Sequence, residues 1–165
     1  MRKESGFTLA ELMIAIAIIV VMSSIVVPTF ISWLPKYRLN NAVTNLAADL
    51  HATKIRAVKE NRQWAIYFSR TKNAYYICSS PGGNLAWDGP GVDGLPGDDV
   101  LVRAIRLRNY GSGVRITAPA ANTTLVFDNR GMCLNTIQVT LTNMAGSPSY
   151  QVLNTLSGGV ISDKL

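Results

Sequence analysis

The sequence predicts an α+β fold in which a long N-terminal helix packs on an antiparallel β-sheet or on two small sheets. Three observations predict it: a long apolar segment near the N-terminus, an amphipathic stretch directly after it, and many short β-type runs in the C-terminal half. The chain has 165 residues, enough for one domain with its own core. It is 48% hydrophobic and only 16% charged, which excludes an intrinsically disordered chain.

The apolar segment, residues 7–27, contains a single charged residue, Glu11. As a helix it is about 31 Å long, which matches the thickness of a hydrocarbon core. Arg2 and Lys3 precede it, and this basic leader predicts a cytoplasmic N-terminus with the rest of the chain across the membrane. An ordinary secretory signal does not fit, because the apolar stretch is too long and no small-residue cleavage site follows it. Glu11 is costly inside a membrane unless it has a partner.

Residues 3–13, KESGFTLAELM, resemble the class III signal of type IV pilins and type II secretion pseudopilins. That family has a short basic leader ending in Gly, then Phe-Thr-Leu, a Glu at the fifth mature position and an apolar helix. The resemblance implies cleavage between Gly6 and Phe7 by the prepilin peptidase, followed by N-methylation of Phe7. It also implies that Glu11 pairs in a filament with the Phe7 ammonium of a neighbouring subunit, since two charges in an apolar core are tolerable chiefly as a pair. Pro28 occupies another family position.

Residues 36–62 have the pattern of an amphipathic helix that ends near Asn61. Prolines remove a helix hydrogen bond, so we expect a bend at Pro28 and a second bend or break at Pro35. His51 lies off the apolar stripe and is expected to be solvated rather than a ligand or base. The stripe, which we expect to pack on the sheet, consists of Leu39, Val43, Leu46, Leu50, Thr53 and Ala57.

The segment 46–68 is similar to the GspH/FimT branch of pilin-like proteins, in which such a helix leads into the first strand. Residues 127–131 resemble the F-x-x-x-G turn of the same branch. The resemblance therefore implies a type IV pilin-like fold with a leader peptide at 1–6, a transmembrane and filament-core helix at 7–35, and a globular domain at 36–165. In the β-rich part, residues 64–165, the expected strands are 64–69, 74–78, 100–107, 114–118, 125–128, 137–143 and 150–153.

The stretch 87–99 is a loop rich in glycine and aspartate. Calcium takes several oxygen ligands, and such a loop can supply them. The spacing is not that of an EF-hand, and an exposed loop whose aspartates cap turns is the favoured interpretation, with no cofactor. The calcium candidates are Asp88, Asp93, Asp98 and Asp99.

Two cysteines, Cys78 and Cys133, lie in the part that is expected outside the cytoplasm, where disulfides persist. A bridge between them closes a loop of roughly 55 residues, worth on the order of 4 kcal/mol in the entropy model. We favour a structural disulfide over two separate buried thiols.

DNA binding is an alternative function, because FimT-like minor pilins can bind DNA through a C-terminal G-R-x-R motif. Here Gly158 is present, but Gly159 and Ile161 stand where the arginines belong, which weighs against that route. A second basic feature could contact phosphate, because positions 106 and 108 are expected to share one face of a strand, although solvated arginines are the favoured interpretation. It consists of Arg103, Arg106, Arg108 and Arg115.

The predicted function is that of a structural filament subunit: a minor pilin of a type IV pilus or a pseudopilin of a type II secretion system. No catalytic motif is present, so an enzyme is not expected. A major pilus subunit has the same leader and remains a further alternative. The expected partners are other pilin or pseudopilin subunits, the prepilin peptidase and the bacterial inner membrane, which the chain crosses once, with its globular domain periplasmic or extracellular.

The formal charge of +6 has a defined location. Residues 36–72 contain eight basic and two acidic residues, whereas residues 73–165 contain six of each. The mature chain carries +5, because Arg2, Lys3 and Glu4 leave with the leader. The excess therefore lies on the helix just outside the membrane and on the first strand, which favours contact with anionic headgroups or acidic neighbouring subunits.

Overall fold

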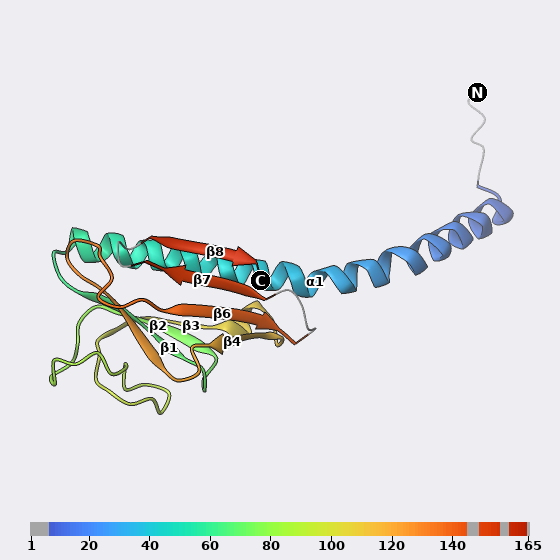
Figure 1. Ribbon diagram of the computed structural model, residues 1–165. Coiled ribbons are helices and arrows are strands. Elements are labelled where there is room, and N and C mark those ends of the chain that lie inside the picture. Colours follow the sequence, from blue (N-terminus) through green and yellow to red (C-terminus); the bar gives the residue numbers. More distant parts are fainter. Residues whose placement is uncertain (1–6, 145–148, 156–158, 165) are drawn as a thin grey trace, which may run out of the picture. The chain divides into compact units, whose positions relative to one another are not determined.

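The computed structural model describes residues 7–144, 149–155 and 159–164. The chain divides into two compact units, residues 1–34 and residues 35–165, and each is described by itself. The helix α1 (Leu9–Lys59) contributes to both units, and all strands belong to the second (Figure 1).

Helix α1 is assigned as helical without interruption over its 51 residues, including Pro28 and Pro35. Of the two outcomes predicted at Pro35, a bend or a break, the break is therefore wrong. Each proline removes only one backbone hydrogen bond, and the loss of one bond does not end a helix that has many others. Next to Pro28, the hydroxyl of Thr29 donates a hydrogen bond to the carbonyl of Ile25 at 3.0 Å. Serine and threonine side chains within helices often bond to the carbonyl four residues earlier in this way.

Asn61 terminates α1, as the sequence predicts. Its φ is +50°, the left-handed conformation that asparagine tolerates better than most residues. The amide of Arg62 donates to the carbonyl of Ala57 at 3.2 Å, and that of Asn61 to Val58 at 3.3 Å, which is the Schellman pattern. The side chain of Asn61 also accepts a hydrogen bond from Asn129, in the predicted F-x-x-x-G turn.

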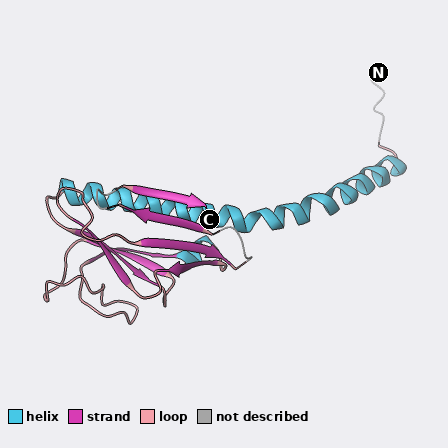
Figure 2. Ribbon diagram, in the orientation of Figure 1, coloured by secondary structure: helices cyan, strands magenta, loops and turns pink. Residues whose placement is uncertain are grey.

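In the described part of the chain, eight strands form two antiparallel sheets, so of the two predicted arrangements the one with two small sheets is correct (Figure 2). The first sheet has the order β3-β2-β1-β5 and the second β4-β6-β7-β8. A short 3-10 helix, η1, joins β3 to β4. The bounds are β1 Trp64–Ser69, β2 Ala74–Cys78, β3 Leu101–Arg106, η1 Leu107–Tyr110, β4 Val114–Ala118, β5 Thr123–Phe127, β6 Gln138–Asn143, β7 Tyr150–Asn154 and β8 Val160–Lys164.

Seven of these strands lie at or close to the predicted ranges, and β8 was not expected. Only two of its five residues, Val160 and Ile161, are apolar, so no alternating pattern marks it. It becomes a strand because β7 offers an edge, with which it pairs from Tyr150–Lys164 to Asn154–Val160.

The main hydrophobic core lies between α1 and the two sheets. All six residues of the predicted stripe are buried, together with Ala42. They contact the inner faces of both sheets, where the largest buried side chains include Phe68, Tyr75 and Phe127. This burial confirms that the stripe is the packing face of the helix.

The two central strands, β1 and β2, are buried on both faces. Tyr67, Tyr76 and Cys78 point away from α1 into a second, smaller cluster that Leu95 completes, with Trp87 packed against it. The loop between β2 and β3 thus covers the outer face of the first sheet. The expectation of a merely exposed loop is corrected, because Leu95 and Trp87 supply apolar surface that the sheet needs.

Candidate assembly segment, basic pocket and acidic loop

The first turn of α1 carries the residues that the filament interpretation needs. The hydroxyl of Thr8 accepts a hydrogen bond from the amide of Glu11 at 3.2 Å, so Thr8 caps the helix. Thr8 and Glu11 have the spacing of a capping box, and an acidic residue in the first turn also complements the helix dipole. Phe7 is 76% exposed at the start of this turn. The predicted cleavage residue Gly6 lies outside the described residues.

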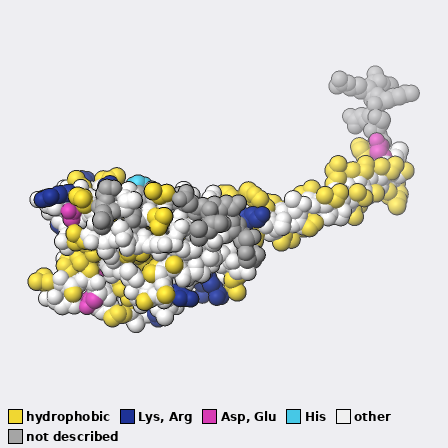
Figure 3. Space-filling model, viewed as in Figure 1, with side chains coloured by type: hydrophobic (Ala, Val, Ile, Leu, Met, Phe, Trp, Pro, Cys, Tyr) yellow, Lys and Arg dark blue, Asp and Glu magenta, His cyan; other side chains and the backbone are white. Residues whose placement is uncertain are grey.

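The N-terminal unit exposes an apolar surface. From Phe7 to Trp33 every residue except the half-buried Ala15 is exposed, and hydrophobic side chains cover this part of α1 (Figure 3). α1 contains a window apolar enough to cross a membrane, none of it buried. A shallow apolar depression lies on the same segment, lined by Ile25, Val26, Thr29, Phe30 and Trp33. A surface of this size and composition requires lipid or other apolar helices around it.

The four candidate arginines fall into two groups: Arg103 and Arg106 form ion pairs with aspartates, whereas Arg108 and Arg115 line a surface cavity. Arg103 donates to Asp49 on α1 at 3.0 Å, and Arg106 forms an ion pair with Asp93 at 2.9 Å. Both cations are therefore largely neutralised by a local carboxylate. Arg108 lies in η1 rather than on a strand, because β3 ends at Arg106. The expectation that 106 and 108 share a strand face is wrong.

Arg108 and Arg115 line one surface cavity of about 680 Å³ together with two cations that the sequence did not single out, Arg70 and Lys72. These two come from the turn between β1 and β2. Asn73 holds this turn in place: its side chain donates to Val114 at 2.7 Å and accepts from the amide of Ile116 at 3.0 Å. We call the cavity lined by Arg70, Lys72, Arg108 and Arg115 the basic pocket. Its charge pattern suits an anionic group.

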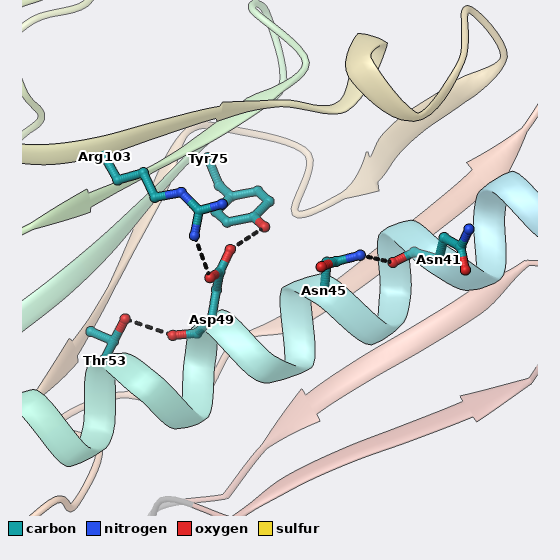
Figure 4. A network of polar contacts seen from close by, with 6 residues as sticks. All are labelled: Asn41, Asn45, Asp49, Thr53, Tyr75 and Arg103. Carbon is teal, nitrogen blue, oxygen red and sulfur yellow. Dashed lines mark hydrogen bonds and ion pairs between the residues drawn. The ribbon is translucent and has the colours of Figure 1, made fainter.

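Asp49 joins the helix to the first sheet (Figure 4). Tyr75 in β2 and Arg103 in β3 both point toward its carboxylate, which accepts the Tyr75 hydroxyl at 2.7 Å. Tyr75 is fully buried, so this is the bond that satisfies its hydroxyl inside the protein. Burial, followed by the contact with Asp49, raises the pKa of Tyr75 well above its ordinary value.

Three of the four calcium candidates lie together and the fourth does not. Asp88, Asp98 and Asp99 each place a carboxylate oxygen within 4.8 Å of the others. Asp93 instead binds Arg106 and accepts the Tyr76 hydroxyl at 3.1 Å. The hydrogen bond from Arg106, and then that from Tyr76, lowers the pKa of Asp93.

Asp99 is in the opposite electrostatic situation from Asp93. Burial raises the pKa of Asp99, the amide of Gly89 opposes the rise, and the carboxylate of Asp88 adds to it. Negative charge therefore accumulates around Asp99 without a cation among the described residues to balance it.

The structure corrects the predicted disulfide, since no bond joins Cys78 and Cys133. Cys78 lies in the outer cluster, whereas Cys133 lies in the main core on the opposite face of the first sheet. In the strand register, Cys78 of β2 lies opposite Ala65 of β1, and Ala65 lies opposite Val126 of β5. Cys133 forms an isolated antiparallel β-bridge with the next residue of β5, Phe127. Three successive spacings of about 4.8 Å exceed the reach of a disulfide.

The Cys78 thiol is expected to resist alkylation in the folded protein at pH 8 and to react once denaturant is added. Burial, reinforced by Asp99, raises the pKa of this thiol to about 12, so almost no thiolate is present to react. Peptide mass spectrometry after iodoacetamide treatment measures this. A disulfide-linked Cys78–Cys133 peptide in protein isolated under oxidising conditions would contradict the structure.

The C-terminal position of the G-R-x-R motif is only partly visible. Gly158 lies outside the described residues, while Gly159 and Ile161 belong to the described part, where Thr155 and Gly159 hydrogen-bond to each other. Ile161 is exposed in β8. No positively charged side chain stands at either of these two positions.

Comparisons with known proteins agree with this architecture. The family model "Prokaryotic N-terminal methylation motif" matches residues 1–27, and the model "Type II transport protein GspH" matches residues 42–158. The fold is similar to a crystal structure of the type IV minor pilin FimU of Pseudomonas aeruginosa, with a TM-score of 0.58 and 15% identity over 78% of this chain and 90% of that one. A second crystal form of FimU gives a TM-score of 0.54 and 15% identity, over 76% and 92% of the two chains. No curated protein matches the sequence.

Proposed function

Because the chain belongs to the GspH family of type II transport proteins, whose model covers residues 42–158, we propose that it is a minor subunit of a pilus-type filament. Two machines fit the proposal: a type II secretion system, after the name of the family, and a type IV pilus, to which FimU belongs. Pilins and pseudopilins are structural proteins and not enzymes.

One observation carries the proposal: the methylation motif and the exposed apolar half of α1 stand directly before a GspH-type domain. The subunit first spans the inner membrane with its domain outside. After the prepilin peptidase cleaves between Gly6 and Phe7 and the new Phe7 amine is methylated, the subunit moves sideways into the filament. Helix contacts then replace lipid contacts, and Glu11 pairs with the Phe7 ammonium of a neighbour.

Replacing Gly6 with valine is expected to leave the protein unprocessed and confined to the membrane, because the larger side chain keeps the prepilin peptidase from reaching the scissile bond. Immunoblots of membrane and sheared-filament fractions, with mass spectrometry of the N-terminus, measure both effects. Ser5→Ala, one residue earlier in the leader, is the matched control and should be processed normally. Normal incorporation of the Gly6→Val protein into filaments would contradict the proposal.

DNA binding is the second candidate function, and the basic pocket is the observation that favours it. Arg70, Lys72, Arg108 and Arg115 form no ion pair among the described residues, so their charges are available to phosphates. Binding of this kind is dominated by phosphate contacts and weakens steeply with salt.

The double substitution Arg108→Ala/Arg115→Ala is expected to weaken binding of duplex DNA to the full chain in detergent and to reduce its salt dependence. Electrophoretic shifts at low and physiological salt give both quantities. Arg103→Ala is the matched control, because Asp49 already neutralises that cation. If the unsubstituted protein binds no DNA at either salt concentration, the second candidate is eliminated.

A further inference from the structure

The loop that covers the outer face of the first sheet contains a compact group of carboxylates. Asp88, Asp98 and Asp99 place one oxygen each within 4.8 Å of one another. The ion pairs of the described residues use Asp49, Glu60 and Asp93 instead. Three negative charges this close repel one another unless a positive charge lies between them.

Asp99 supplies the observation that points to a ligand. Asp99 is only 3% exposed, and its Oδ2 accepts a hydrogen bond from the amide of Gly89 at 3.0 Å. Its Oδ1 is buried and has no partner in hydrogen-bonding geometry among the described residues. The backbone amide of Gly82 lies near the carboxylate and lowers its pKa, but burial is the larger effect and raises the pKa. A buried carboxylate oxygen without a partner is costly, so a positively charged partner would remove that cost.

The other two carboxylates are held in place by one oxygen each. Oδ2 of Asp98 accepts the amide of Gly83 at 2.7 Å, and Oδ2 of Asp88 accepts the side-chain amide of Asn84 at 2.7 Å. In all three aspartates one oxygen is therefore fixed by the loop, and the other oxygen can face a shared ligand. These hydrogen bonds orient the three carboxylates without neutralising their negative charge.

We propose that Asp88, Asp98 and Asp99 bind one calcium ion, which fastens the loop over the outer face of the first sheet. Calcium bonds to oxygen are 2.3–2.6 Å long, so two ligands on opposite sides of one ion lie at most about 5 Å apart. The observed separations satisfy that limit. The donor set is all carboxylate, with neither His nor Cys in the group, which favours a hard cation over zinc.

The consequence for the fold follows from what the loop carries. Leu95 is 8% exposed and packs in the outer cluster with Tyr67 and Tyr76. Asp88 stands next to Trp87, which packs on the same cluster, and Asp99 precedes β3 by two residues. An ion that ties Asp88 to Asp98 and Asp99 therefore joins the two ends of the stretch 87–99, which contains Leu95. The proposal does not depend on the filament function.

Calorimetric titration of the metal-stripped full chain in detergent with calcium chloride tests the site. One equivalent of calcium is expected to bind, with a dissociation constant of about 10⁻⁴–10⁻³ M, the range of extracellular calcium modules. Saturation should raise the melting temperature of the domain by about 3–6 °C. Magnesium at the same concentration should produce a smaller shift, because it demands a stricter octahedral geometry.

Asp98→Asn is the decisive variant, because Asp98 is exposed and its replacement should not prevent folding. It is expected to weaken calcium binding at least tenfold and to abolish the calcium-dependent rise in melting temperature. Asp93→Asn is the matched control: it lies in the same loop and loses the ion pair with Arg106, yet should bind calcium normally.

Asp99→Asn gives a second signature. Its melting temperature in chelator should equal or exceed that of the unsubstituted protein, because the repulsion is relieved, while its response to calcium is lost. If that variant does not fold, Asp98→Asn alone decides. Absence of calcium binding at 10-fold above the expected dissociation constant, or equal effects of Asp98→Asn and Asp93→Asn, would overturn the proposal.

Discussion

Replacing Glu11 with glutamine is expected to abolish incorporation of the mature subunit into filaments, while leader cleavage continues. Glu11 is the one charged residue between Phe7 and Leu34, and the proposed partner is the Phe7 ammonium of a neighbouring subunit. Breaking a buried pair by removing one charge costs about 3–5 kcal/mol, which corresponds to a loss of about 100-fold or more in incorporation. Quantitative immunoblots of sheared filaments against membranes measure the loss.

Glutamine is chosen because it separates two roles of this residue. A glutamine can still complete the capping box with Thr8, so the first helical turn should be preserved while the charge is lost. Ser24→Leu is the matched control, since the Ser24 hydroxyl bonds only to the carbonyl of Val21 in its own helix among the described residues. Incorporation of Glu11→Gln at the level of the unsubstituted protein would show that the charge pair is unnecessary.

Replacing Asp49 with alanine is expected to lower the free energy of unfolding of the globular domain by about 2–4 kcal/mol. The substitution leaves the hydroxyl of the fully buried Tyr75 without its 2.7 Å acceptor. It also removes the ion pair with Arg103, but the Arg103 side chain is 59% exposed, so that part contributes at most about 1 kcal/mol. Urea denaturation followed by tryptophan fluorescence measures the change.

Tyr75→Phe and Arg103→Ala apportion this effect. Tyr75→Phe removes the hydroxyl together with its need for an acceptor, so it should cost less than Asp49→Ala, and the double variant should be less destabilised than the sum of the two. Arg103→Ala should cost about 0–1 kcal/mol. If Asp49→Ala costs no more than Arg103→Ala, the buried hydroxyl does not stabilise the contact between helix and sheet.

Local patterns were sufficient for most of the secondary structure. The spacing of Leu39, Leu46 and Leu50 identified the packing face of α1, and a single asparagine, Asn61, identified its end. These features can be predicted because their physical causes act within a few residues of the chain. Strand β8 escaped prediction because its cause is the free edge of β7 and not its own composition.

The candidate sites depended on long-range pairing and could be predicted only in part. Arg103 pairs with Asp49, which is 54 positions away in the chain, and Arg106 pairs with Asp93, which is 13 positions away. Spacing alone therefore could not identify which cations form no ion pair among the described residues. Arg70 and Lys72 were missed for the same reason: they join Arg108 and Arg115 only when the turn between β1 and β2 meets β4. Of the four loop aspartates, three lie together because the loop returns on itself.

The amino-acid sequence by itself determined the family, the apolar helix with its lone Glu11, and the alternation of short strands, because each is a property of neighbouring residues. Only the tertiary structure decided that two sheets form and that Cys78 and Cys133 lie on opposite faces of the first sheet. It also decided that the glycine-rich loop is an apolar cover held by its own carboxylates. These outcomes follow from which surfaces must be buried together, and that is settled only when the whole chain has packed.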